Sequence, residues 1–307
     1  MVAYLFAGQG SQYIGMGKDL CESYPAAKEI FDKADTTLGF SLKKLCFEGP
    51  IEELTKTNNS QPAILTVSIA ALKAYQSLFP CAAPLLSCTA GLSLGEYSSL
   101  VASEALSFED AVYLVRRRGE FMEEEALKRP GKMASIIGLD YAQVKEVCAE
   151  SGVEIANLNC PGQVVISGGA QEIDQAVKIA QDKGAKRVII LEVSGAFHSS
   201  FMAGASLKLA KELDKIEINP PIIPVVSNVS AKAVNDPDEI KDNLIKQVSS
   251  SVLWEDSMRF ILSKGIGDFI EFGPGKVLKG LMRRIDEQAS VSSIEKKQDL
   301  LNLMESR

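Results

Sequence analysis

Histidine is nearly absent from this chain of 307 residues, which contains only one, His198. A zinc or non-haem iron site built on several histidines is therefore excluded, and so is a cluster of histidines that senses pH. The six cysteines show no CxxC pair and no spacing typical of zinc ligands; they are Cys21, Cys46, Cys81, Cys88, Cys148 and Cys160. We interpret them as buried free thiols in a reducing compartment, and we expect no metal and no cofactor.

Positive charge is in deficit, because 33 Lys and Arg residues face 40 Asp and Glu residues, for a formal net charge of −7. Nucleic-acid binding is disfavoured, since affinity for a phosphate backbone comes from Lys and Arg side chains. An acidic partner could therefore dock only on a local basic patch.

Long apolar runs are also missing. No segment approaches the roughly 18 apolar residues of a membrane span, and residues 1–10 lack the pattern of a secretory signal. We therefore expect a cytoplasmic protein that does not enter membranes. The composition, 46% apolar and 24% charged, is that of a globular protein, and the length allows one large domain with a smaller one.

Strands, glycine turns and helices alternate along the first part of the chain. Val2–Phe6 is predicted to be a strand that ends in the turn Gly8-Gln9-Gly10, followed by a helical stretch through Leu20. Pro84–Cys88 is predicted to be a second strand, which leads through Gly91 into another helix. This order is typical of an α/β fold with a mostly parallel sheet.

Residues 131–195 follow a different order: strand, helix, strand, strand, helix, strand. The predicted segments are Ala134–Leu139, Tyr141–Ser151, Val153–Leu158, Gln163–Ser167, Gln171–Lys183 and Arg187–Val193. Pro161-Gly162 marks the turn between the two middle strands, and the whole order is ferredoxin-like. We therefore predict a hydrolase-like core domain with a parallel sheet over residues 1–130 and 196–307. A small ferredoxin-like α+β subdomain is inserted at 131–195.

The segment Gly91-Leu92-Ser93-Leu94-Gly95 matches G-x-S-x-G at a point where a strand is expected to turn into a helix. Glycines two residues before and after the serine let the strand and helix approach, and the hydroxyl then stands at the helix N-terminus. Ser93 is therefore a candidate nucleophile. A glycine-rich loop in which Ser93 only caps the helix explains the same residues.

His198 is the candidate base for that serine. A hydroxyl becomes a good nucleophile when a base takes its proton, and imidazole suits this task near neutral pH. His198 follows an expected strand and the small residues Ser194-Gly195-Ala196, and it comes after the serine as in hydrolase-like folds. The alternative is a lone surface or core histidine.

An arginine on an apolar helix face gives a clue to the substrate. Ala111, Leu114, Val115 and Met122 form an apolar stripe, and Arg118 falls in the middle of it. A buried guanidinium must be paired, because an uncompensated buried charge is costly. It could bind a ligand carboxylate through two parallel hydrogen bonds, or it could form a structural salt bridge to an internal Asp or Glu.

The first glycine turn suggests an oxyanion hole rather than a phosphate site. Tyr13 occupies the third glycine position of a dinucleotide-binding G-x-G-x-x-G pattern, which disfavours that interpretation. An oxyanion hole typically combines the backbone amide after the nucleophile with an amide from another loop. Leu94 and Gln9 are the candidates for these two amides.

Six motifs, each occurring once, are spread over roughly residues 1–285. They are Gly8–Gln12, Gly91–Tyr97, Arg118-Gly119, Asn159–Val165, Gly195–Ser199 and Gly273–Lys276. Together they resemble the malonyl-CoA:acyl carrier protein transacylases and the acyltransferase domains of polyketide synthases.

This resemblance implies a ping-pong transfer of a malonyl group from malonyl-CoA to an acyl carrier protein. Ser93 would attack the thioester and carry the acyl group, and His198 would act first as base and then as acid. The backbone amides of Gln9 and Leu94 would stabilise the oxyanion. Arg118 would bind the free carboxylate of malonate.

The resemblance also implies roles for residues around this centre. The backbone carbonyl of Leu253 would orient the histidine, and Asn159 and Asn228 would line the site. Leu92 stands where the family commonly has His, so it bears on the fine tuning of substrate choice. Phe197 belongs to a motif version that the family associates with malonyl rather than methylmalonyl groups.

A further departure is Ala7, which stands where the family commonly has Pro before the first glycine turn. An acidic carrier protein and the CoA phosphates need positive charge on this acidic chain. Candidates for a steering patch are Lys276, Lys279, Arg283 and Arg284, with Arg116 and Arg117, which the helix pattern points away from the core. Solvated helix charges explain each of them equally well. We expect a monomer.

Two other functions remain open at this stage: a hydrolase of the same fold, and a non-catalytic module that docks a carrier protein. Arg118 argues against the hydrolase, because a carboxylate clamp selects a diacid monothioester. The choice between fatty-acid and polyketide synthesis also stays open.

Overall fold

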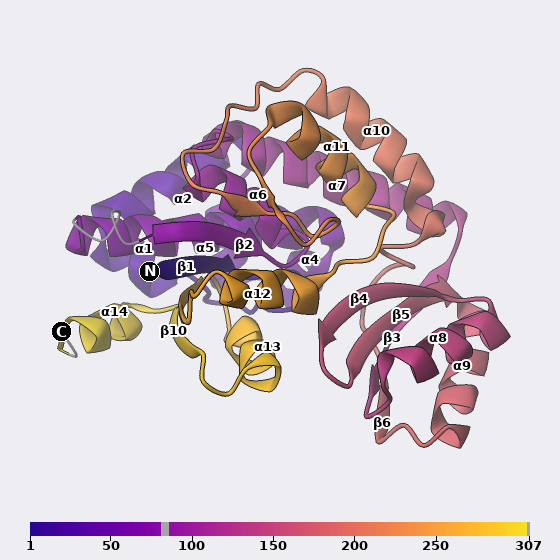
Figure 1. Ribbon diagram of the computed structural model, residues 1–307. Coiled ribbons are helices and arrows are strands. Elements are labelled where there is room, and N and C mark those ends of the chain that lie inside the picture. The colour runs from indigo at the N-terminus through magenta and orange to yellow at the C-terminus, as the bar shows by residue number, and fades with distance from the viewer. Residues whose placement is uncertain (81–85, 306–307) are drawn as a thin grey trace.

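The computed structural model describes residues 1–80 and 86–305 and contains two separate β-sheets (Figure 1). The larger sheet has the strand order β10-β9-β1-β2-β7-β8. Its strands are β10 (Ser290–Ile294), β9 (Asp268–Phe272), β1 (Val2–Phe6), β2 (Leu86–Gly91), β7 (Val225–Val226) and β8 (Ala233–Val234). Neighbouring strands run parallel except for β7 and β8, which are antiparallel, so the predicted mostly parallel sheet is confirmed.

Both faces of this sheet are covered, as the apolar sequence of its central strand requires. Tyr4 and Phe6 of β1 pack into a core formed largely by α2, α5 and α7. Ala3 and Leu5, whose side chains point to the opposite face, pack into a second core with α12 and α13. A parallel strand that alternates between two cores is apolar at nearly every position.

The helices around the large sheet come from every part of the chain outside the small sheet. They are α1 (Lys18–Ser23), α2 (Pro25–Leu38), α3 (Leu42–Glu48), α4 (Ile51–Thr55), α5 (Thr57–Leu78), α6 (Gly95–Ala102), α7 (Phe108–Lys128), the short 3-10 helix η2 (Ser200–Met202), α10 (Ala203–Leu213), α11 (Pro237–Gln247), α12 (Trp254–Ser263), α13 (Val277–Ile285) and α14 (Lys297–Glu305).

The smaller sheet has the order β4-β5-β3-β6 and is antiparallel throughout. It consists of β3 (Gly131–Ile137), β4 (Glu154–Cys160), β5 (Gln163–Gly169) and β6 (Arg187–Ile190), with the helices α8 (Tyr141–Ser151) and α9 (Ala170–Asp182). The predicted ferredoxin-like order is therefore present, and these elements enclose a third apolar core. All strands of this sheet lie within residues 131–195, whereas the domain boundaries themselves stay a prediction.

β4 is joined to the segment that precedes α12. Asn157 forms a parallel bridge with Val252, and Leu158 N–H donates to the Val252 carbonyl at 2.9 Å. Val252 N–H donates in return to the Ala156 carbonyl at 2.8 Å. The segment before α12 is thus fixed to the edge of the small sheet.

Several sequence boundaries shift in the structure. The helix expected to run through Leu20 begins only at Lys18, because Gly15 and Gly17 adopt positive φ angles of 94° and 74° that a helix cannot contain. The strand expected at 84–88 begins outside the described residues, and β2 extends it to Gly91.

The five cysteines in the described part of the chain are free, and Cys81 lies outside it. Within residues 1–80 and 86–305, no helix is both long enough and apolar enough to cross a membrane.

Candidate active site

The candidate site lies at the carboxyl edge of the large sheet, where parallel strands deliver their following loops to one place. Gln9 follows β1, Ser93 follows β2 and Asn228 follows β7, and these three strands are neighbours in the order β1-β2-β7. Gly8 of the first turn touches the second loop, since a Cβ atom on Gly8 would lie 2.6 Å from the Leu92 carbonyl oxygen. The sheet therefore brings together residues that are far apart in the sequence.

Ser93 occupies a sharp turn between β2 and α6. Its φ of 51° is unusual for a residue with a side chain, as expected of a nucleophile on a strained strand-to-helix turn. A Cβ atom on Gly91 would lie 2.0 Å from the Gly95 backbone, and one on Gly95 would lie 2.2 Å from the Phe6 carbonyl oxygen. Both glycines of G-x-S-x-G are thus required by close packing, which a loop with a mere capping serine would not need.

Asn228 holds this turn in place. Ser93 N–H donates to Asn228 Oδ1 at 2.6 Å, and Asn228 Nδ2 donates to the Gly91 carbonyl at 2.8 Å. Because Asn228 is fully buried and both bonds are made to the turn itself, it supports the strained backbone. Asn228 was expected to line the site, and the structure places it directly beneath Ser93.

His198 lies against the serine. Ser93 Oγ and His198 Nε2 are 2.8 Å apart, and His198 Nδ1 is 2.8 Å from the Gln247 carbonyl oxygen. With Nδ1–H donating to that carbonyl, Nε2 is left to accept the serine proton. The sequence prediction that these two residues meet is confirmed across 105 positions of the chain.

The carbonyl that orients His198 belongs to Gln247, and the expectation of Leu253 was wrong. Leu253 is the N-cap of α12, and its carbonyl accepts from Ser257 N–H at 3.0 Å and Ser257 Oγ at 2.7 Å. A carbonyl that makes the first hydrogen bond of a helix points along the helix axis and cannot serve the imidazole. The Leu253 N–H instead donates to the Asn228 carbonyl at 2.9 Å.

Burial lowers the pKa of His198 to about 4, with a further lowering from the nearby Arg118 charge. Backbone carbonyls of Gln247 and Ser250 oppose the shift by stabilising the charged ring. The imidazole is therefore neutral at physiological pH and able to accept a proton.

Arg118 is 1% exposed and reaches the nucleophile. Its Nη2 donates to Ser93 Oγ at 3.1 Å and to Gln247 Oε1 at 3.1 Å, while Nη1 donates to Gln61 Oε1 at 2.7 Å. No Asp or Glu of the described chain forms an ion pair with Arg118, and its buried Nε has no hydrogen-bond partner there. The alternative of a structural salt bridge is therefore not what the fold provides.

Gln61 and Gln247 were not singled out from the sequence. Both are fully buried, and both hold the guanidinium with neutral amide oxygens rather than with a carboxylate. Buried glutamine is uncommon, but no local pattern distinguishes it from an exposed one. The contacts that reveal these residues join α5, α7 and α11.

The other expected site residues occupy varied positions. Leu94 is fully buried at the start of α6, and Phe197 is buried next to His198. Leu92 is partly buried and packs against the core shared with α12 and α13. Asn159 lies in β4, and its buried Oδ1 has no hydrogen-bond partner within the described residues. Gln9 donates through its side chain to Thr57 Oγ1 at 3.4 Å.

The basic residues expected to attract a carrier protein fall into two groups. Lys276, Lys279, Arg283 and Arg284 are exposed at the start of α13 and along it. Arg284 donates to Gln163 Oε1 of the small sheet at 2.6 Å, and Lys276 is 3.9 Å from Asp299. These four side chains remain available as a surface patch.

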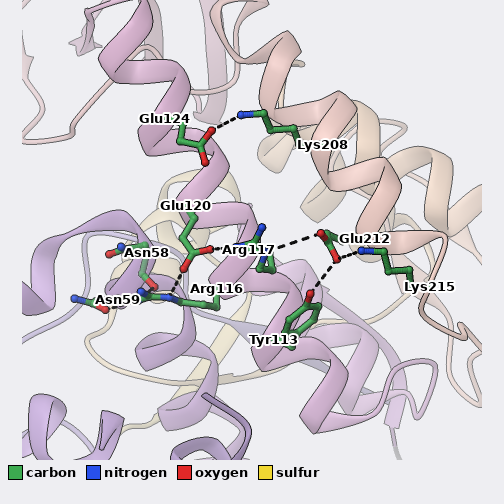
Figure 2. Close-up of polar contacts among 10 residues, drawn as sticks. All are labelled: Asn58, Asn59, Tyr113, Arg116, Arg117, Glu120, Glu124, Lys208, Glu212 and Lys215. Carbon is green, nitrogen blue, oxygen red and sulfur yellow. Dashed lines mark hydrogen bonds and ion pairs between the residues drawn. The ribbon is translucent and has the colours of Figure 1, made fainter. Parts of the chain in front are cut away.

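Arg116 and Arg117 do not join that patch. Figure 2 shows both engaged with neighbours: Arg116 pairs with Glu120 at 2.8 Å, and Arg117 pairs with Glu120 and Glu212. Arg116 also donates to the Asn58 carbonyl at 2.9 Å and to Asn59 Oδ1 at 2.5 Å. Both guanidinium groups are therefore held by neighbouring residues, and a contribution from them to steering charge stays a prediction.

No group of three or more His, Cys, Asp and Glu side chains in the described residues could hold a metal ion. The site combines a strained serine, a neutral histidine and an arginine that has no carboxylate partner within residues 1–80 and 86–305. That combination suits serine acyl transfer to or from an anionic group.

Comparison with known proteins shows the family to which this chain belongs. The acyl transferase domain family matches residues 3–298, so the chain belongs to the acyl transferase family. The malonyl CoA-acyl carrier protein transacylase of Bacillus subtilis (strain 168) is 49% identical over 300 residues, which cover 95% of this chain and 93% of that protein. Within the family, the chain therefore belongs with the malonyl CoA-acyl carrier protein transacylases, as its motifs predicted.

Solved structures agree with this placement. The acyl-carrier-protein S-malonyltransferase of Bartonella henselae has a TM-score of 0.96 and 38% identity, with 99% of this chain and 98% of that one covered. A malonyl-transacylase solved in complex with its type II PKS acyl-carrier protein has a TM-score of 0.95 and 38% identity, covering 100% and 99% of the two chains. The mixed α/β fold with its two sheets is thus the fold of these malonyltransferases.

Proposed function

We propose that this protein moves a malonyl group from malonyl-CoA to the phosphopantetheine thiol of an acyl carrier protein, through an acyl-enzyme on Ser93. The observation that carries the proposal is that Arg118 Nη2 lies 3.1 Å from Ser93 Oγ, while no carboxylate of the described residues pairs with Arg118. A malonyl thioester carries one carboxylate at the distance of a single methylene from the reacting carbonyl. The same guanidinium can therefore bind the acyl group that the serine attacks.

In the first half-reaction, Ser93 Oγ attacks the thioester carbonyl carbon while its proton passes to His198 Nε2, 2.8 Å away. The tetrahedral intermediate collapses as the C–S bond breaks, and His198 returns the proton to the departing CoA sulfur. In the second half-reaction, the carrier thiol gives its proton to His198 and attacks the seryl ester. The Ser93 oxygen leaves as a hydroxyl, so the enzyme is restored and no cofactor is consumed.

The backbone amides of Gln9 and Leu94 are proposed to stabilise the oxyanion. Leu94 follows the nucleophile at the start of α6, and the turn that contains Gln9 packs against the nucleophile loop through Gly8 and Leu92. Amides held in this way need little rearrangement when negative charge develops on the carbonyl oxygen. One chain supplies all of these groups, which supports a monomer as the working unit.

Malonyl rather than a bulkier branched group is the proposed acyl chain. Phe197, which is 4% exposed and precedes His198, is proposed to limit the space for the acyl group. Leu92 and Asn159 are proposed to line the entrance for the pantetheine arm, with the unpaired Asn159 Oδ1 available to a ligand N–H group.

The carrier protein is proposed to approach α13. Exposed Lys276, Lys279, Arg283 and Arg284 form a local positive patch on a chain of net charge −7. Acidic partners are steered by such patches even when the whole protein is acidic.

Brief exposure to malonyl-CoA followed by mass spectrometry of the intact protein tests the proposal. A malonyl adduct on Ser93 that disappears when carrier protein is added, with malonyl-carrier formed in equal amount, is the expected result. An adduct that decays to free malonate despite added carrier would instead identify a hydrolase, and the absence of any adduct would leave only a docking module. Ser93→Ala is the matched control, because it removes the attacking oxygen and leaves the turn.

A further inference from the structure

Glu96 is a buried carboxyl group that the transfer chemistry does not use. It lies in the first turn of α6, three residues after the nucleophile, and is 2% exposed. Its Oε2 accepts from Asn228 N–H at 3.1 Å and from Gln247 Nε2 at 2.6 Å. An acidic side chain this deep in a protein is rare unless it is paired, so its partners indicate its task.

The important partner is Gln247, because it forms hydrogen bonds with Ser93, His198 and Arg118. Its backbone carbonyl accepts from His198 Nδ1 at 2.8 Å, and its Nε2 also donates to the Ser93 carbonyl at 3.0 Å. Its Oε1 accepts from Arg118 Nη2 at 3.1 Å. One side chain therefore links the buried carboxyl group to the buried guanidinium.

The direction of this link follows from hydrogen-bond chemistry. Glu96 Oε2 accepts from the NH₂ group of Gln247, so the amide oxygen of Gln247 is turned toward Arg118. Burial raises the pKa of Glu96 to about 7, while hydrogen bonds from Asn228, Gln247 and Ser227 and the Arg118 charge act in the opposite direction.

An indirect link of this kind meets two demands at once. A buried guanidinium needs acceptors when the site is empty, because an unpaired buried charge is costly. A direct ion pair with Glu96 would occupy the face of Arg118 that a substrate carboxylate needs. An amide placed between them satisfies Nη2 with a neutral oxygen and leaves the positive charge for the substrate.

We propose that Glu96 is a positioning residue for recognition of carboxylate-bearing acyl groups, acting through the Gln247 amide on Arg118. The proposal rests on the function proposed above, in which Arg118 binds the acyl carboxylate. Glu96 itself touches neither substrate nor reacting atom.

The test compares acyl-enzyme formation with malonyl-CoA and with acetyl-CoA, which lacks the carboxylate. Glu96→Met keeps the side-chain length but cannot accept a hydrogen bond, so kcat/KM for malonyl-CoA is expected to fall about tenfold or more relative to acetyl-CoA. Glu96→Gln retains an acceptor oxygen and is expected to restore most of the malonyl preference. An unchanged ratio in Glu96→Met would overturn the proposal.

Glu271 offers a matched control. It is 1% exposed and, like Glu96, accepts backbone N–H groups, from Leu278 at 2.8 Å and from Lys279 at 3.1 Å. Glu271→Met therefore removes an equally buried carboxyl group and is expected to lower stability without changing the malonyl to acetyl ratio. A similar ratio change in this control would show a general structural effect.

Two further variants keep the outcome decisive. If Glu96→Met does not fold, Gln247→Leu removes the same link from its other end while the carbonyl for His198 stays, and it is expected to lower the ratio equally. Adding Glu96→Met to Arg118→Ala is expected to change the ratio no further, because both act on one contact. If Arg118→Ala alone leaves the ratio unchanged, the proposed function fails; if Arg118→Ala lowers it and Glu96→Met does not, only this inference fails.

Discussion

At the scale of single residues, the proposed function assigns the choice of substrate to Arg118. Replacement by Ala should lower the preference for malonyl-CoA over acetyl-CoA by about 10–100-fold, since a hydrogen bond to a charged group contributes about 1.5–3 kcal/mol. The measurement is kcat/KM for acyl-enzyme formation with each thioester. Arg116→Ala is the control, because that neighbouring guanidinium is held by Glu120 and Asn59 away from the serine. Equal losses for both thioesters would contradict the clamp.

His198 makes stability depend on pH with a definite sign. Its pKa is about 4 in the folded protein against 6.5 for an ordinary histidine, so the unfolded chain binds more protons between these values. The stability that the neutral ring represents is present above pH 6.5 and is lost as the pH falls toward 4. Relative to His198→Asn, which cannot titrate, the wild type should lose up to ~3 kcal/mol over this range.

Denaturant unfolding of both proteins from pH 8 to pH 4 measures this difference. Parallel curves for the two proteins would mean that the ring is not held neutral. Glu96 works in the opposite sense, because its raised pKa of about 7 makes stability fall as the pH rises from about 4.5 to 7. Both proteins retain Glu96, so its contribution cancels in the comparison.

At the scale of elements, the turn after β2 depends on glycine for steric reasons. Gly91→Ala should lower the rate of acyl-enzyme formation by at least about 10²-fold and destabilise the fold. The new Cβ would lie 2.0 Å from the Gly95 backbone. Gly280→Ala on α13 is the control, with no atom near its Cβ position. It should stabilise the protein by about 0.5–1 kcal/mol and leave acylation unchanged. Mass spectrometry and thermal unfolding follow the two effects separately.

Helices α7 and α10 are joined by a polar network (Figure 2). Glu212 on α10 accepts from Tyr113 at 2.9 Å and from Lys215 at 2.9 Å, and it lies 3.9 Å from Arg117 of α7. The network fixes α10, which begins shortly after His198, to the helix that carries Arg118.

Glu212→Ala should cost about 1–3 kcal/mol in the free energy of unfolding, because it leaves a partly buried tyrosine hydroxyl and an arginine short of partners. Lys208→Ala removes the more exposed pair with Glu124 and should cost at most about 1 kcal/mol. Chemical denaturation measures both. A larger loss from Lys208→Ala than from Glu212→Ala would contradict this ranking.

At the scale of the whole molecule, charge is unevenly placed on an acidic chain. Arg283→Glu should lower kcat/KM for the carrier protein severalfold and weaken its dependence on salt, while acylation by malonyl-CoA at saturation stays constant. Lys178→Glu on α9 is the control, since it makes the same charge change on an exposed residue outside α13. Transfer rates measured over a range of ionic strength distinguish a docking patch from a general effect of net charge.

The three central residues could be found from the sequence because each carries a local signal. Ser93 lies between glycines at a strand-to-helix turn, Arg118 interrupts an apolar stripe, and His198 is the chain's one imidazole. Glu96, Gln247 and Gln61 gave no such signal. Their contacts span large distances in sequence, 151 residues from Glu96 to Gln247 and 57 from Gln61 to Arg118.

The sequence by itself therefore determined the ferredoxin-like element order of residues 131–195, the mostly parallel type of the large sheet and the candidates Ser93, His198 and Arg118. Periodicity, glycine spacing and residue chemistry are local properties. Only the tertiary structure decided which carbonyl faces His198, and it gave Gln247 the role expected for Leu253, whose carbonyl is used by α12. It also decided that, within the described residues, Arg116 and Arg117 form ion pairs with carboxylates whereas Arg118 is held by the amides of Gln61 and Gln247. Partners of this kind are fixed when β1, β2 and β7 bring their loops to one edge of the sheet, and no single segment contains that information.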